Sequence, residues 1–185
     1  MQTEWTVRAI TWATLPVLLA LTLIEIGSGL VLESFEAELL RSPSLLVLVP
    51  VTVGSAGNLG SVLAARLSTA FHLGTLSFAV DDDVLVGNAA ATVALAATIF
   101  PLVGAGAWLL AEATVGARLS LARVLAVAVT SGLALSVLAV AVTLVATYAA
   151  YRYELDPDDI VIPVVTNVCD VLGVVVLFVV VGVLV

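Results

Sequence analysis

Five long apolar stretches constrain this chain most, because each is long enough to cross the roughly 30 Å hydrocarbon core of a bilayer as a helix. They cover about residues 12–32, 45–65, 84–111, 121–149 and 160–185. The last stretch is rich in β-branched residues, but an open strand in lipid would leave its backbone groups unpaired. The sequence therefore predicts an all-α, polytopic integral membrane protein with five transmembrane helices. A single transmembrane domain over residues 1–185, in contact with membrane lipid, is expected.

The charged residues lie mostly between these stretches and limit the classes of partner. There are 14 acidic and six basic residues, giving a net charge of −8, which argues against nucleic acid as a partner. The six arginines divide equally between the two sides of the predicted membrane, so the positive-inside rule gives no orientation. An odd number of spans does place the two termini on opposite sides.

Asp170 is the most informative polar residue, because it lies deep inside the last apolar stretch. Thr166, Asn167 and Gly173 share its helical face at i−4, i−3 and i+3. Carboxylate, amide and hydroxyl oxygens suit a hard cation such as Mg²⁺. These residues are therefore candidate metal ligands. The alternative is a protonated Asp170 that hydrogen-bonds to neighbouring helices.

Two further polar interruptions lie inside the apolar stretches. The segment Gly54–Gly60 carries Asn58, and its glycines permit local unwinding that would expose carbonyls to a water-filled path. Close helix packing uses similar glycine spacing and is an equal alternative. Glu25, in the first stretch, either lines the path or pairs with an arginine at the end of another span.

Acidic side chains also cluster in the predicted loops. Glu36, with Glu33 and Glu38, could concentrate cations at the mouth of a pore through its field. A solvated acidic loop is the commoner interpretation of such a group. The same two interpretations apply to Asp81–Asp83 and to Asp156–Asp159.

The remaining reactive side chains point to no enzyme. His72, in a predicted polar loop over residues 66–83, and the single Cys169 are interpreted as structural, and no His/Cys cluster predicts a zinc site. No Ser–His–Asp set, phosphate-binding loop or dinucleotide fingerprint occurs in the sequence. The chain is therefore not expected to be an enzyme.

Three sequence segments resemble, in the same order along the chain, three helices of the transmembrane domain of a known family of membrane proteins. Phe35-Glu36 resembles the outer end of a first helix, and Leu48–Asn58, continuing to Ala65–Ala70, resembles a second helix. Asp156–Asp158 and the later Asp170–Gly173 turn resemble a fifth helix. The chain resembles the MgtE magnesium channels and the related solute-carrier family 41 transporters.

This resemblance implies a divalent-cation transporter of the cell membrane, a homodimer with a pore lined by helices two and five of both subunits. It implies Mg²⁺ as the transported ion, with Mn²⁺ and other divalent cations as alternatives. Asp170 would hold the hydrated ion, Asn58 and Gly54 would line the adjacent constriction, and Thr166 would sit one turn below. The N-terminus would be cytoplasmic, so Glu36 would face outside and Asp156–Asp158 would lie at the cytoplasmic mouth.

One departure from the MgtE pattern concerns regulation. About a dozen residues precede the first predicted span, so we expect a single transmembrane form without the N-terminal and CBS domains.

Two other functions stay open at this point. One is a divalent-cation exchanger coupled to Na⁺ or H⁺, and the other is a structural or assembly membrane protein that transports nothing.

Overall fold

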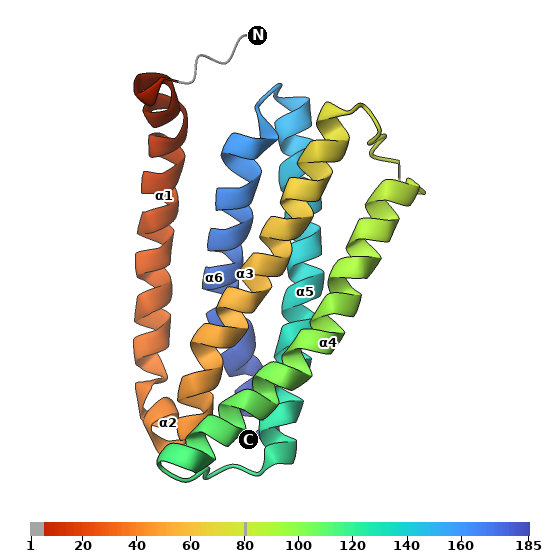
Figure 1. Cartoon of the computed structure of the whole chain (residues 1–185). Helices are drawn as coiled ribbons and strands as arrows, with labels where there is room; N and C mark the ends of the chain where they lie inside the picture. Colours follow the sequence, from red (N-terminus) through yellow and green to blue (C-terminus); the bar gives the residue numbers. More distant parts are fainter. Residues whose placement is uncertain (1–5, 80) are drawn as a thin grey trace.

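The computed structural model describes residues 6–79 and 81–185, which form helices and, within those ranges, no strand. The helices are α1 (Val7–Ser34), α2 (Glu36–Arg41), α3 (Pro43–His72), α4 (Asp83–Thr114), α5 (Leu121–Arg152) and α6 (Pro157–Leu184). All except α2 are long and apolar enough to cross a bilayer. They run up and down in alternation, which places the N- and C-terminal ends at opposite ends of the bundle (Figure 1). The predicted five-span helical fold is confirmed.

The helices extend beyond the predicted spans, and two predicted loops are partly wrong. α3 continues through the start of the predicted polar loop and ends at His72. In this extension Leu67, Ser68 and Ala70 are buried while Arg66 and Thr69 are exposed, so the extra turns are amphipathic rather than irregular. The predicted acidic connector after the first span likewise contains the short helix α2.

Asp82 defines the start of α4 as its N-cap residue. Its carboxylate accepts hydrogen bonds from the backbone N–H groups of Val84 and Leu85, at 2.8 and 3.0 Å. Ser77 donates to it from both its hydroxyl and its backbone N–H. These hydrogen bonds, with those from Ser77 the strongest, lower the pKa of Asp82 to about 2. The charged carboxylate thus satisfies N–H groups that a helix start leaves free.

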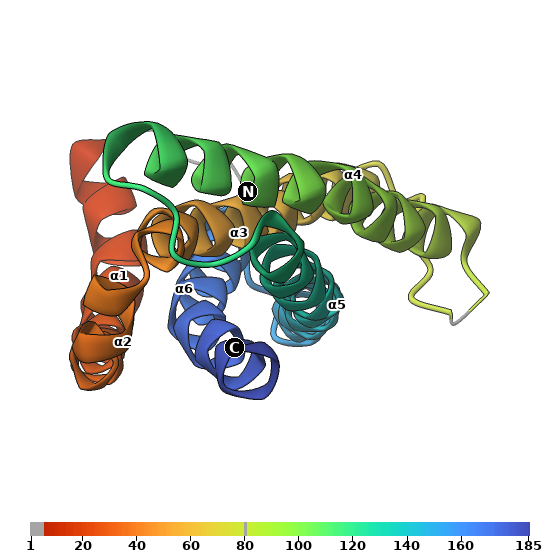
Figure 2. The same cartoon turned by 90° about the horizontal axis from the view of Figure 1, so that it is seen from below.

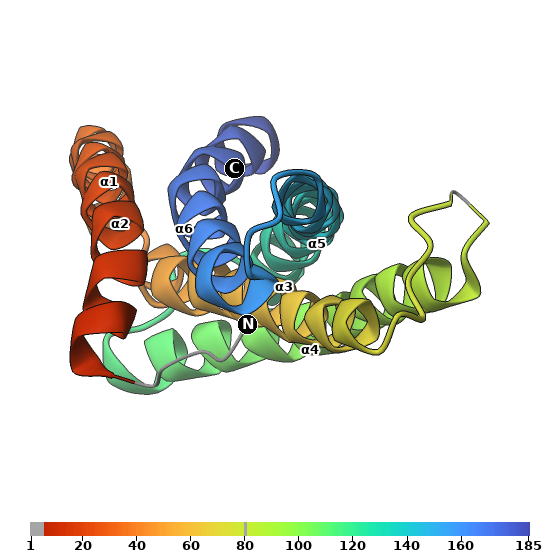
Figure 3. The same cartoon turned by 90° about the horizontal axis from the view of Figure 1, so that it is seen from above.

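α3 lies at the centre of the bundle. It packs against α4, α5 and α6, whereas α1 packs against α6 and the short α2 among the described elements. Seen along the bundle, α1 stands at one edge, and the strongly tilted α4 crosses α3 on the side away from α6 (Figures 2 and 3). One side of α3 consequently has no described helix packed directly against it. Pro50, Gly54 and Asn58, spaced four residues apart, are exposed along α3.

Several buried hydroxyls are satisfied by their own helix, whereas Ser44 Oγ and Thr52 Oγ1 on α3 are buried with no hydrogen-bond partner among the described residues. Ser131, Thr143 and Thr147 on α5 are buried, and each donates to the carbonyl four residues earlier. Such bonds remove the cost of burying a hydroxyl in hydrocarbon. The α5 hydroxyls therefore need no ligand to explain them, which separates them from the polar groups around Asp170.

Candidate functional site

A cavity of about 470 Å³ lies between α1, α2, α3 and α6, near the middle of the bundle. Leucine and valine side chains from all four helices form most of its wall. Asp170 of α6 and Ser28 of α1 are polar lining residues, and Gly54 and Pro50 of α3 complete the wall beside them. The cavity therefore combines a hydrocarbon wall with a partly buried carboxylate.

Gly57 lets α3 approach the Asp170 turn closely. A Cβ atom added there would lie 3.6 Å from Asp170 Oδ1 and 3.6 Å from Thr166 Cγ2. One turn further along α3, the Ser61 and Thr166 hydroxyls lie 2.9 Å apart and share a hydrogen bond. Each hydroxyl also lies 2.9 Å from a carbonyl oxygen of its own helix, that of Gly57 for Ser61 and that of Ile162 for Thr166. Each hydroxyl carries one hydrogen, so one of them donates to its carbonyl while the other donates across to its neighbour. A polar contact between α3 and α6 thus continues from the cavity.

The glycine segment of α3 is not unwound. α3 is a continuous helix from Pro43 to His72, so of the two interpretations left open for Gly54–Gly60 the structure favours close helix packing. Gly57 and Gly60 face α6, where a Cβ at Gly60 would lie 2.5 Å from Val165 Cγ1. Gly54 has no atom within 4 Å of an added Cβ and leaves its side of the cavity open.

Glu25 brings a second carboxylate to the Asp170 region. It lies on α1, one turn before Ser28, whose hydroxyl donates to the Glu25 carbonyl oxygen. The Glu25 and Asp170 charges are close enough to interact. Within the described residues Glu25 forms no ion pair with an arginine. Of the two interpretations open from the sequence, the arrangement favours a place beside the cavity.

The other candidate residues lie apart from Asp170. Asn58 lines a separate cavity of about 300 Å³ between α3 and α4, with Ser55 and Ile99 among its neighbours. Asn167 donates from Nδ2 to the Pro163 carbonyl at 3.0 Å, and its Oδ1 is buried without a hydrogen-bond partner among the described residues. Glu36 is exposed at the start of α2, at the end of the bundle toward which the cavity extends.

The comparisons with known proteins identify the family. A family model described as MgtE, divalent cation transporter, matches residues 49–180, which is well over half of the chain. The chain belongs to this family. The matched region runs from the first third of α3 to the last part of α6 and so contains Gly54, Gly57 and Asp170. Curated proteins and solved structures gave no match.

Membership in the MgtE family fixes the general activity. The protein is a multi-pass membrane protein that transports divalent cations. This is a transporter family and not a class of enzyme, in agreement with the sequence. The expected resemblance is therefore confirmed at the level of family, fold and general activity.

Proposed function

We propose that the protein transports Mg²⁺ as a homodimer, with α3 and α6 of both copies lining a central path and Asp170 holding the hydrated ion. The observation that carries this proposal is the position of Asp170. Its carboxylate lies halfway along a membrane-spanning helix, borders a cavity, and forms no ion pair with an arginine within the described residues. A carboxylate inside a membrane is costly unless a partner compensates its charge, so a cation is the simplest partner.

The size of the cavity fits a hydrated ion better than a bare one. Mg²⁺ prefers six oxygen ligands and sheds its water reluctantly. Six waters occupy roughly 180 Å³ at about 30 Å³ each, well below the cavity volume of about 470 Å³. Thr166 sits one turn from Asp170 on the same face and could accept from the ion's water shell. Only Nδ2 of Asn167 bonds to its own helix, so Oδ1 keeps its acceptor capacity, whereas Glu36 is exposed on α2 and does not line the cavity.

A second copy of the chain would complete the path. Asn58 forms no hydrogen bond to any described residue, and it lies on the exposed stripe of α3 with Pro50 and Gly54. An amide facing lipid would stay unsatisfied, so this stripe is better placed against a partner or water. A two-fold axis beside α3 would bring two Asp170 carboxylates to one ion and neutralise its charge. The family resemblance supports the same arrangement, with a cytoplasmic N-terminus in the cell membrane.

Mg²⁺ flux into liposomes tests the site directly. We expect Asp170→Asn, which removes the charge and keeps the size, to lower the flux by about tenfold or more, since the charge contact is lost. Asp159→Asn is the matched control, because it removes one carboxylate from the exposed first turn of the same helix. Transport by Asp170→Asn at the wild-type rate would contradict the site. Imposing a Na⁺ or H⁺ gradient in the same assay separates a coupled exchanger from passive movement.

Cross-linking tests the homodimer. We expect Asn58→Cys to form a disulfide-linked dimer on oxidation in membranes, because the stripe would meet its copy near the two-fold axis. Cys169 is fully buried, so the wild type should give no cross-link. Val137→Cys, exposed near the middle of α5, is the control at a similar depth. Equal cross-linking of Val137→Cys and Asn58→Cys would argue against α3 as the dimer face.

A further inference from the structure

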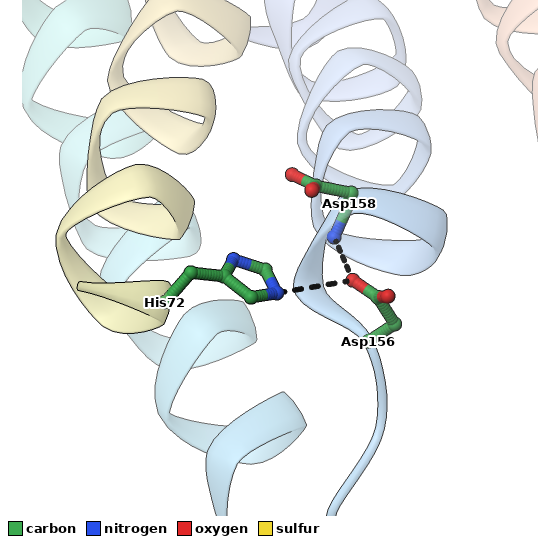
Figure 4. Close-up of side chains that lie close together, drawn as sticks. All are labelled: His72, Asp156 and Asp158. Atoms are coloured by element: carbon green, nitrogen blue, oxygen red, sulfur yellow. Dashed lines mark hydrogen bonds and ion pairs between the residues drawn. The ribbon is translucent and has the colours of Figure 1, made fainter. Parts of the chain in front are cut away.

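A histidine and two aspartates meet at the end of the bundle where α3 finishes and α6 begins. His72 is the last residue of α3, Asp156 is the N-cap of α6, and Asp158 is in its first turn. Their nearest ligand atoms all lie within 4.8 Å of one another, and Figure 4 shows the imidazole directed toward Asp156. The chain segments involved are more than eighty residues apart, so the cluster exists because the two helices pack together.

The imidazole is held with its outer nitrogen free for a ligand bond. His72 Nδ1 lies 2.9 Å from the Ser68 carbonyl oxygen, which can accept a hydrogen bond but cannot donate one. Nδ1 therefore carries a hydrogen, and Nε2 faces Asp156 Oδ1 at 3.9 Å. Metal-binding histidines are typically fixed in this way, with one ring nitrogen donating to a carbonyl and the other on the metal.

The two carboxylates are also held in place by hydrogen bonds. Ser68, which is buried, donates its hydroxyl to Asp158 Oδ1 at 2.5 Å, so the same residue orients both His72 and Asp158. The backbone N–H of Asp158 donates to Asp156 Oδ1 at 3.0 Å. Two adjacent carboxylates and a directed imidazole nitrogen thus share a space to which, among the described residues, no arginine is paired.

From this geometry we propose that His72, Asp156 and Asp158 bind a transition-metal dication such as Zn²⁺, at a site separate from the Asp170 cavity. One nitrogen and two carboxylate oxygens suit Zn²⁺, Co²⁺ or Mn²⁺, whereas Mg²⁺ prefers oxygen ligands alone. Tetrahedral ligands at about 2.0–2.1 Å from a metal lie roughly 3.3 Å apart, so small side-chain rotations would close the site. All three side chains are exposed, which allows those rotations and leaves the fourth position to water.

Because the site lies between α3 and α6, a bound metal would restrain these two helices relative to each other. A bound ion would tie the last turn of α3 to the first turn of α6 at one end of the bundle. These are the helices that carry Gly57 and Asp170, and the tie would form at the end of the bundle opposite α2 (Figure 1). A transition metal bound there would act on the protein from outside the membrane span, independently of the transported ion.

The test is a Co²⁺ titration of the purified protein, followed by its visible absorption. Wild type should bind one Co²⁺ per chain, Zn²⁺ should displace it, and excess Mg²⁺ should not. His72→Ala and Asp158→Asn should weaken binding by about tenfold or more, while Asp159→Asn, the same charge change one residue along, should stay within about twofold. Circular dichroism and size-exclusion chromatography show that each variant is folded.

Two results would overturn the proposal. One is the absence of Co²⁺ absorption from the wild type, and the other is an unchanged spectrum in His72→Ala. If His72 serves as the charged partner of Asp156 alone, its removal would lower the Tm but Zn²⁺ would not raise the Tm of the wild type. Asp170→Asn should keep the Co²⁺ signal, so failure of the transport site and failure of this site give different results.

Discussion

The α4–α5 and α3–α6 contacts both use glycine to bring two helices together, but they fill the space opposite the glycine differently. Between α4 and α5, Gly132 faces the ring of Phe100, and Gly104 faces Ala128 with an added Cβ only 2.8 Å from the Ala128 Cβ. Between α3 and α6, Gly60 also meets hydrocarbon, at Val165, but Gly57 faces Asp170 and Thr166 at ordinary contact distance. One contact is closed by hydrocarbon, and the other places a carboxylate and a hydroxyl next to a cavity.

This difference shows what a glycine in a membrane helix does and does not indicate. Small residues permit close approach in both contacts, as they do between membrane helices generally. The polar residue on the opposing helix distinguishes the α3–α6 contact, together with the hydrogen bond between Ser61 and Thr166. Glycine spacing alone would therefore assign the two contacts the same role. We expect substitutions of the two glycines to separate stability from transport.

The largest effect on stability is expected from Gly132→Ala. A Cβ there would overlap the Phe100 ring, which is fully buried and has no space to move into. Overpacking of this kind costs about 1–3 kcal/mol, more than the roughly 1 kcal/mol that alanine gains over glycine in a helix. The variant should show a lower Tm in detergent, and Phe100→Leu in the same chain should restore part of it. Mg²⁺ flux per folded protein should stay at the wild-type level.

Gly106→Ala is the matched control for this experiment. It also adds one methyl group to a helical glycine, on α4, but nothing lies within 4 Å of its added Cβ. A Tm for Gly132→Ala equal to that of Gly106→Ala would mean that the Phe100 ring can move aside and that α4 and α5 are not closely packed there. The α4–α5 contact would then not be closed by hydrocarbon, and the stated difference from the α3–α6 contact would be wrong.

The sequence predicts the five membrane helices well, because an apolar run of this length has few other stable structures in lipid. It predicts the ends of the helices less well. Arg66 and Thr69 look like loop residues in the sequence, yet they form the exposed face of two further turns of α3. A short amphipathic extension at the end of an apolar span has about the same length and polar composition as a loop. The sequence alone therefore does not distinguish the two. Because the sequence predicts a loop at His72, it offers no reason to expect this residue near Asp156.

Part of the candidate site could also be predicted, because a carboxylate deep in an apolar helix needs an explanation wherever it occurs. Asp170 and Gly54 do border the same cavity. The sequence could not show which side of α3 faces α6, since neighbouring helical residues differ in direction by about 100°. Gly57, and not Asn58, lies against Asp170. The closeness of Glu25 to Asp170 depends on the packing of α1 against α6, which no local pattern encodes.

Gly57→Ala should affect stability least and is the sharper test of the polar contact. Its added methyl group would meet Asp170 Oδ1 and Thr166 Cγ2 at 3.6 Å, an ordinary contact, so the Tm should stay within a few degrees of the wild type. The methyl group would occupy space beside the carboxylate that water needs, and Mg²⁺ flux should fall severalfold. Gly106→Ala should leave the flux unchanged and raise the Tm slightly, because alanine is favoured over glycine in a helix by about 1 kcal/mol. Normal flux in Gly57→Ala would mean that Gly57, like Gly132, serves helix packing alone, and that the ion passes Asp170 on its other side.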